Sequence, residues 1–171
     1  MTYIYRLAGE NLELAEAELE GFLRSQNIQE EPERRERIAE TDEEPEMLKR
    51  LALTHEASRK KAEIELDKLD EKEINIQSDE SFAAKCRVID GEEDPQKIEE
   101  ILGEKISSDK NSVELENPDK IYNAYVLDER ILVGEEVVDI NRGLFQDRSN
   151  EKRPFSSPIS LDPVLARVLI N

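Results

Sequence analysis

Two side chains are of the types that most often act as nucleophiles, general bases or zinc ligands, and each occurs once. His55 is the only histidine and Cys86 the only cysteine among 171 residues. A structural zinc site takes about four ligands, mostly His or Cys, and a histidine relay needs a positioned nucleophile beside it. We therefore assign no catalytic role to His55. Cys86 alternates with apolar residues, so we expect it to pack in a core.

The densest run of carboxylates lies between Glu30 and Glu46. Carboxylate oxygens are the ligands that calcium prefers, but the run lacks the spaced Asp or Asn ligands and the central glycine of an EF-hand loop. The sequence therefore predicts a solvated acidic surface and no metal site.

The charge balance argues against a simple basic nucleic-acid binder. Lys and Arg number 24 and Asp and Glu 42, so the net charge is −18 and the pI is near 4.5. The excess is uneven, because residues 141–171 hold five basic and three acidic side chains, a net of +2 against −20 for residues 1–140. Such acidity suits a protein kept soluble at high salt, where charges are screened, so it does not exclude RNA.

A local basic cluster lies beside aromatic residues near the C-terminal end of the sequence. Its members are Arg142, Arg148, Lys152 and Arg153, and the aromatic residues among them are Phe145 and Phe155. Basic side chains bind phosphate oxygens, and aromatic rings stack on unpaired bases. The cluster therefore predicts RNA contacts. The alternative is that these side chains pack a linker between domains, and for Phe155 we prefer that alternative.

The periodicity of the first 59 residues predicts mixed α and β structure. The expected elements are a strand over 2–8, a helix over 12–23 capped by Asn11, two weak edge strands between 28 and 44, a short helix from Pro45 to Leu51, and a strand over 51–57 that could also be read as a helix. Strand, helix, two strands, helix and strand are the order of a ferredoxin-like unit.

The second half also predicts mixed structure, after a helical, linker-like stretch over residues 60–80. The expected elements are a strand over 82–89, a helix opened by Asp94 and Pro95 and running to Ile106, and strands over 121–127 and 131–138 joined by a turn at 128–130. Residues 141–160 are rich in serine and proline and predict a linker.

A final helix is expected to begin at Pro163, and much of it is apolar. An apolar helix with no cap and no following element suggests that the chain is the front part of a longer protein. The alternative is that the helix folds back on its own domain.

Several stretches have a joint resemblance to one family. They are YRLAGENLELAEAELEGFL, RLALTHEAS, SFAAKCRVIDG, ELENPD and, most specifically, VGEEVVDINRGLFQDRSNEKRPFSSPISLDPVLARVLIN. Together they resemble the archaeal tRNA guanine N2-methyltransferases that modify the guanosine at position 10. In the last run, the residues at the family's spacing are Arg142, Phe145, Arg148, Arg153, Pro154, Phe155, Pro158, Ser160, Leu161, Pro163, Leu165, Ala166 and Arg167.

The resemblance implies an α+β fold and a division of the chain. It implies a ferredoxin-like domain over residues 1–59, a THUMP domain over 60–140, a linker over 141–160 and the truncated first helix of a methyltransferase domain over 161–171. A THUMP domain holds the 3′ single-stranded acceptor end of tRNA, so the resemblance also implies that Lys85 and Arg87 face RNA. Plain solvated charge is an equal alternative for these two residues.

The family uses S-adenosylmethionine, but this sequence has neither a Gly-x-Gly loop nor a Pro-Pro motif. We therefore expect a tRNA-binding chain with no cofactor and no catalysis of its own, and a methyltransferase domain or subunit docking on residues 161–171. The alternatives are a free-standing THUMP adaptor for a separate enzyme subunit and an acidic protein-interaction domain without RNA.

No stretch of the sequence approaches the length of a membrane span, and the N-terminus lacks the pattern of a signal peptide. We expect no membrane contact and a cytoplasmic location.

Overall fold

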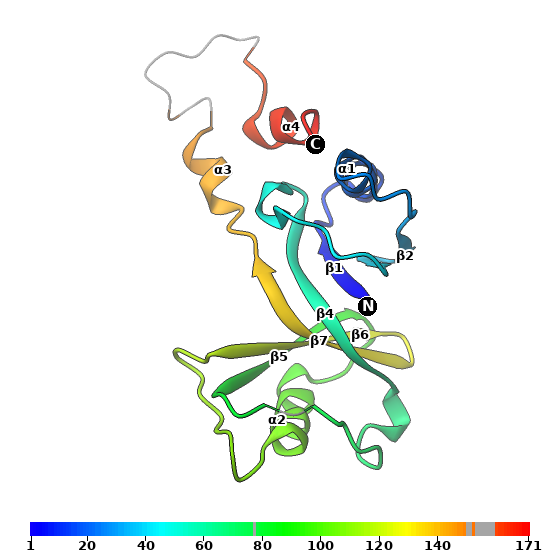
Figure 1. Ribbon diagram of the computed structural model, residues 1–171, viewed down its shortest axis with the longest axis vertical. Helices are drawn as coiled ribbons and strands as arrows, with labels where there is room; N and C mark the ends of the chain where they lie inside the picture. The colour runs from blue at the N-terminus through cyan, green and yellow to red at the C-terminus, as the bar shows by residue number, and fades with distance from the viewer. Residues whose placement is uncertain (77, 150–151, 153–159) are drawn as a thin grey trace. The chain divides into compact units, whose positions relative to one another are not determined.

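The computed structural model describes residues 1–76, 78–149, 152 and 160–171. Its strands are hydrogen-bonded in the order β2-β3-β1-β4-β7-β6-β5 (Figure 1). The chain forms two compact units: unit 1 comprises residues 1–57 and 138–171, and unit 2 comprises residues 58–137. Two long strands, β4 (Thr54–Glu65) and β7 (Arg130–Asp139), contribute residues to both. This mixed sheet with helices confirms the predicted α+β class.

Unit 1 begins with the predicted strand and helix, β1 (Tyr3–Leu7) and α1 (Leu12–Ser25). The Asn11 side chain accepts a hydrogen bond from the Leu14 amide at 3.0 Å, which caps the helix as the sequence predicts. The two strands that follow, β2 (Glu33–Arg35) and β3 (Ile38–Thr41), form an antiparallel hairpin. β3 also pairs antiparallel with β1.

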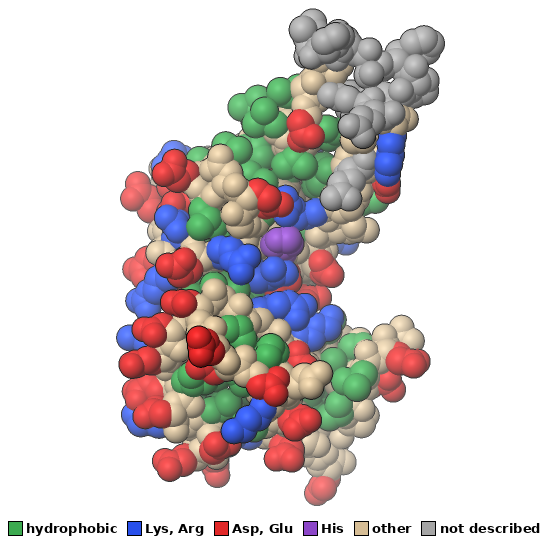
Figure 2. Space-filling view, turned by 180° about the vertical axis from the view of Figure 1, so that it is seen from behind, with side chains coloured by type: hydrophobic (Ala, Val, Ile, Leu, Met, Phe, Trp, Pro, Cys, Tyr) green, Lys and Arg blue, Asp and Glu red, His purple; other side chains and the backbone are tan. Residues whose placement is uncertain are grey.

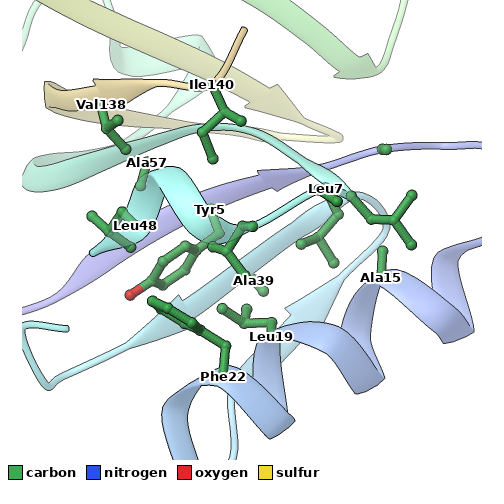
Figure 3. Close-up of a cluster of buried hydrophobic side chains, with 14 of the residues drawn as sticks. Tyr5, Leu7, Ala15, Leu19, Phe22, Ala39, Leu48, Ala57, Val138 and Ile140 are labelled. Atoms are coloured by element: carbon green, nitrogen blue, oxygen red, sulfur yellow. The ribbon is translucent and has the colours of Figure 1, made fainter. Parts of the chain in front are cut away.

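The core of unit 1 lies between α1 and its strands (Figure 3). The helix turns Ala15, Leu19 and Phe22 toward Tyr5 and Leu7 of β1, and all five are fully buried. Apolar residues three or four positions apart form one stripe on a helix, and this stripe covers the sheet. The sequence periodicity therefore identified the packed face of α1.

Two details of unit 1 differ from prediction. Only β2 is exposed at the sheet edge, whereas β3 lies between β1 and β2 and buries Ile38 and Ala39. Two apolar residues are enough to keep β3 inside the sheet, because β3 is paired with a strand on each side. The expected helix after Pro45 is only a 3-10 turn, Leu48–Arg50, and Met47 before it has a φ of 53°.

Unit 2 contains a β-α-β crossover. β5 (Phe82–Asp90) and β6 (Lys120–Leu127) are parallel neighbours, so their connection must cross the sheet, and α2 (Pro95–Ile106) provides the crossover. β6 then pairs antiparallel with β7 across a turn in which Asp128 has a φ of 52°. These elements confirm the sequence prediction.

The core of unit 2 lies under α2, which buries Ile98, Leu102 and Ile106. In the same core, the rings of Phe82 and Tyr122 meet edge to face with their centroids 5.8 Å apart.

The predicted helical linker over residues 60–80 is wrong. β4 continues to Glu65, and the helical structure among the described residues that follow up to 80 is a 3-10 turn, Leu66–Lys68. Charged residues in this strand form ion pairs across the sheet: Lys61 with Glu135 at 2.6 Å and Glu63 with Arg130 at 2.9 Å. The strand was not recognised because its polar positions carry paired charges rather than the residues typical of strands.

The last part of unit 1 contains two short helices, α3 (Gly143–Asp147) and α4 (Pro163–Val168). The Asp162 side chain caps α4 by accepting from the amide of Val164 at 2.8 Å. Val168 is buried in the unit 1 core, so α4 folds back on its own unit, whereas Leu169 and Ile170 remain exposed. Within the described part of the chain, no helix has the length and apolarity to cross a membrane.

Candidate nucleic-acid interface

Lys85 and Arg87 lie on one face of the unit 2 sheet. In the register of the strands, Lys85 is level with Asn123 of β6, and Arg87 is level with Tyr125. Residues level with one another in a sheet project from the same face, and neighbours along a strand project from opposite faces. The two cations therefore lie opposite Cys86, which is buried in the core with α2.

A buried polar network lies on this same face. The Ser58 hydroxyl is 3.0 Å from the Tyr125 hydroxyl, and the Asn123 Nδ2 donates to Ser58 Oγ at 3.2 Å and to Glu136 Oε2 at 2.9 Å. Ser58, Asn123 and Tyr125 are all fully buried. Such a network fixes side chains in one arrangement and gives this sheet face a rigid, polar floor.

The two cations differ in their partners. Arg87 donates from Nη1 to the carbonyl oxygen of Cys86 at 3.1 Å, while Lys85 has no ion-pair partner among the described residues. Both are half-buried. A half-buried ammonium without a carboxylate partner, next to a rigid polar floor, can bind a phosphate oxygen.

The predicted cluster of unit 1 divides into residues with different surroundings. Arg142 donates from Nε to the Ala52 carbonyl oxygen and from Nη1 to Glu10 Oε1, both at 2.9 Å, and only 19% of its side chain is exposed. It therefore ties the segment after β7 to the loop before β4.

The remaining members lie along and beyond α3. Arg148 is exposed, and Lys152 is exposed and paired with Asp147 at 2.8 Å. The bond from Lys152 lowers the pKa of the Asp147 carboxyl. Phe145 packs half-buried against the unit 1 core. Arg153 and Phe155 lie outside the described residues.

The histidine and the cysteine have surroundings that suit no nucleophile. Burial lowers the pKa of His55 most, and the nearby positive charges of Arg6 and Arg142 lower it further. Burial raises the pKa of the Cys86 thiol to about 12, so the reactive thiolate is suppressed. Figure 2 shows Lys and Arg side chains gathered around the single histidine on one face of the molecule.

The polar network and Arg6 were missed by sequence reasoning. Arg6 forms a two-pronged pair with Glu56, from Nε to Oε1 at 2.9 Å and from Nη2 to Oε2 at 2.8 Å. One signal was available for the network: Asn123 interrupts the apolar run of β6, and a polar residue inside a buried strand needs partners.

The chain is partly homologous to archaeal tRNA-modifying enzymes. It is 31% identical over 93 residues to the tRNA (guanine(10)-N2)-dimethyltransferase of Methanothermobacter thermautotrophicus, and 34% identical over 74 residues to that of Pyrococcus abyssi. These alignments cover 54% and 43% of this chain but only 28% and 22% of the two relatives. No protein-family model matches the chain.

Solved structures share its fold. TrmN from Thermus thermophilus matches 99% of this chain with 54% of its own, at a TM-score of 0.68 and 17% identity. A 4-thiouridine synthetase, solved in complex with RNA and ATP, matches 83% of this chain with 44% of its own, at a TM-score of 0.54 and 16% identity. The fold is therefore the α+β arrangement of the THUMP region of such proteins, as expected.

Proposed function

We propose that this chain is a tRNA-binding module that holds the 3′ acceptor end and positions the tRNA for methylation of guanine 10 by a catalytic domain outside this chain. The observation that carries the proposal is the partial homology to two archaeal tRNA (guanine(10)-N2)-dimethyltransferases. The RNA bound to a 4-thiouridine synthetase of the same fold adds support. Such a module selects its target by distance and shape, so it need not read the sequence.

The proposed contact surface in unit 2 is the sheet face that carries Lys85 and Arg87. The buried network of Ser58, Asn123 and Tyr125 holds the floor of this face, so the two cations project from a rigid support. In unit 1, Arg148 and Lys152 supply further phosphate contacts. Arg142 serves chiefly to hold the chain that carries them. Arg153 stays a predicted contact.

S-adenosylmethionine is the methyl donor that the proposed function requires, and the residues present here do not fit it. Binding of such a donor needs a glycine-rich loop after a strand, where the backbone can approach the ligand closely. The glycines of this chain include no Gly-x-Gly, and no Pro-Pro dipeptide occurs. We therefore derive no methyl transfer on this chain and assign the donor to the separate catalytic domain.

The catalytic domain, or a separate subunit, is proposed to dock on residues 161–171. Leu161, Leu165, Leu169 and Ile170 are exposed there, while Val168 holds the segment on unit 1. A free-standing adaptor that recruits a separate enzyme would use the same exposed side chains. The reading frame downstream of Asn171 separates the two: a continuing frame with a glycine-rich loop favours one long enzyme, and a stop codon favours the adaptor.

The test is a titration with tRNA and with the same tRNA lacking its 3′ single-stranded nucleotides, followed by fluorescence anisotropy at low salt. We expect the shortened tRNA to bind at least about tenfold more weakly, because stacking alone contributes about 1–3 kcal/mol per unpaired base. Equal affinity for both tRNAs, or binding of neither, contradicts the proposal. Binding of neither favours an acidic protein-interaction domain.

The contact surface has its own test. Lys85→Glu and Arg87→Glu should each weaken tRNA binding and reduce its salt dependence, because each removes a phosphate contact. Lys97→Glu is the matched control, since Lys97 is exposed on α2, which packs on the other face of the same sheet. An equal loss in all three variants would mean that only net charge matters.

A further inference from the structure

A hollow of about 610 Å³ lies in unit 1, beside α3 and α4. Its lining includes Arg148, one of the two unit 1 residues proposed above to contact phosphate, whereas the sheet face with Lys85 and Arg87 belongs to unit 2. Its volume is within the range of about 300–1,000 Å³ that small-molecule sites occupy. The lining side chains that matter for ligand binding are Lys49, Asp139, Ile140, Phe145, Arg148 and Arg167.

The charge of this hollow is opposite to that of the chain. Lys49, Arg148 and Arg167 line it, and Asp139 is the one carboxylate among its described lining residues. Among the described lining residues, three cations against one anion give a net charge of +2, in a chain whose net charge is −18. Cations gathered at one concave place favour an anion there, because the low-dielectric walls of a hollow focus the field of the charges that line it.

One of the cations is fixed in place by the backbone. Arg167 donates from Nε to the carbonyl oxygen of Arg50 at 2.9 Å. Arg50 ends the same 3-10 turn that carries Lys49. The terminal nitrogens of the Arg167 guanidinium have no hydrogen bond to other described residues. A guanidinium held by Nε loses little freedom when its terminal nitrogens bind two phosphate oxygens.

The other walls of the hollow are apolar and partly aromatic. Phe145 is half-buried and packs on the unit 1 core, which holds its ring. Ile140, which also lines the hollow, is buried in the same core. A fixed aromatic ring beside aliphatic carbon offers a flat surface on which a nucleobase can stack.

We infer that this hollow binds a nucleoside phosphate, with the phosphate between Lys49, Arg148 and Arg167 and the base against Phe145. The ligand has two sources: a free mononucleotide, or an unpaired nucleotide of an RNA. The second source rests on the proposed function, and the first does not. Asp139 faces the same space and opposes the anion, so it limits the affinity.

The probe is AMP, titrated into the whole chain by isothermal calorimetry, with adenosine and inorganic phosphate as partial ligands. We expect AMP to bind at least about tenfold more tightly than either part, because only AMP uses both the cations and the ring. Lys49→Glu should weaken AMP binding at least about tenfold, since it replaces attraction by repulsion, and Asp139→Asn should strengthen it. Phe145→Leu, which keeps the apolar packing, should weaken AMP and leave phosphate binding unchanged.

The controls are Lys97→Glu, which makes the same charge change far from the lining residues in sequence and in the other unit, and circular dichroism of every variant. Absence of AMP binding, or an equal effect of Lys49→Glu and Lys97→Glu, overturns the inference whatever the tRNA titration shows. If AMP binds, competition by a short single-stranded oligoribonucleotide identifies RNA as the source, and lack of competition identifies a free nucleotide. Failure of the proposed function leaves AMP binding intact, so the two outcomes are distinguishable.

Discussion

The two units satisfy their buried polar groups in different ways. In unit 1 the buried carboxylate of Glu18 accepts from the amides of Ala52 and Leu53, at 2.9 and 2.8 Å, and from Asn171 Nδ2 at 2.7 Å. In unit 2 the Asn123 Nδ2 donates to the hydroxyl of Ser58 and to the carboxylate of Glu136 on the sheet face. In unit 1 a buried carboxylate holds the loop before β4, whereas in unit 2 side chains of neighbouring strands bond one another and hold a sheet face.

The cations differ residue by residue, because Arg87 of unit 2 also donates to a backbone carbonyl oxygen, that of Cys86. Arg142 and Arg167 of unit 1 donate to the carbonyl oxygens of Ala52 and Arg50, so each fixes a segment. Lys85 of unit 2 has no such bond among the described residues. A basic residue near a predicted binding site is therefore not by itself a contact, because its hydrogen-bond partners decide how many of its donors stay available.

The largest expected effect tests the charged side of this comparison. Glu18→Ala should lower the free energy of unfolding by about 3 kcal/mol, because two backbone amides stay buried with no acceptor and each costs about 1–3 kcal/mol. Urea unfolding followed by circular dichroism measures the loss. Glu13→Ala is the matched control, an exposed glutamate on the same helix, and should cost less than about 1 kcal/mol. Equal losses would show that Glu18 does not hold the loop before β4.

A smaller effect is expected for the Ser58 hydroxyl in the network of unit 2. Ser58→Ala removes the hydroxyl that joins Tyr125 to Asn123, and should cost about 1–2 kcal/mol, the range for lost neutral hydrogen bonds in a buried place. Ser107→Ala, at an exposed serine of the same unit, should change the free energy of unfolding by less than about 0.5 kcal/mol. A Ser58 loss as large as that of Glu18 would end the distinction between the units.

The third prediction separates cations that hold the fold from cations that bind. Arg142→Ala should lower the free energy of unfolding by about 1–2 kcal/mol, because Ala52 and Glu10 lose their donor. Lys85→Ala should leave stability within about 0.5 kcal/mol of the wild type but weaken tRNA binding. Unfolding curves and tRNA titrations on both variants give the two readouts. If Lys85→Ala lowers stability and Arg142→Ala weakens only tRNA binding, then Lys85 holds the fold and Arg142 is the contact.

The sequence predicted the elements whose periodicity is regular. α1, β5, α2 and the hairpin of β6 and β7 all have apolar residues at one clear spacing, with Asn11 and Asp94 as caps. Residues 58–65 were missed because the charges of β4 are paired across the sheet, which no local pattern reveals. The sequence predicted a helix from Pro45 to Leu51, where the structure has only a 3-10 turn at 48–50. The local pattern there is helical, but the chain continues into β4 instead.

Less of the site could be predicted. The alternation of β5 correctly gave Lys85 and Arg87 a common face opposite Cys86. The partners of Arg142 could not be foreseen, because Ala52 and Glu10 are 90 and 132 positions away in the sequence. The hollow beside α3 and α4 was equally hidden, since Lys49 and Arg167 come together only when α4 folds back on unit 1.

The smallest expected effect is the dependence of stability on pH, and it belongs to His55 in unit 1. Burial and then the charges of Arg6 and Arg142 lower its pKa from 6.5, and Glu56 and Glu10 partly oppose them. In the unfolded chain the imidazole binds a proton near pH 6.5, while in the folded chain it resists protonation. Protons therefore favour the unfolded state, and stability falls as the pH drops below about 6.5 until the lowered pKa is reached.

The test compares His55→Gln with the wild type by urea unfolding from about pH 7.5 downward to about pH 5.5. The wild type should lose more stability over this interval than the variant, which has no imidazole to protonate. Arg142→Ala should give an intermediate slope, because removing one nearby positive charge lets the His55 pKa rise toward its ordinary value. If wild type and His55→Gln have the same slope, then the charged groups that hold unit 1 together do not act on the histidine among them.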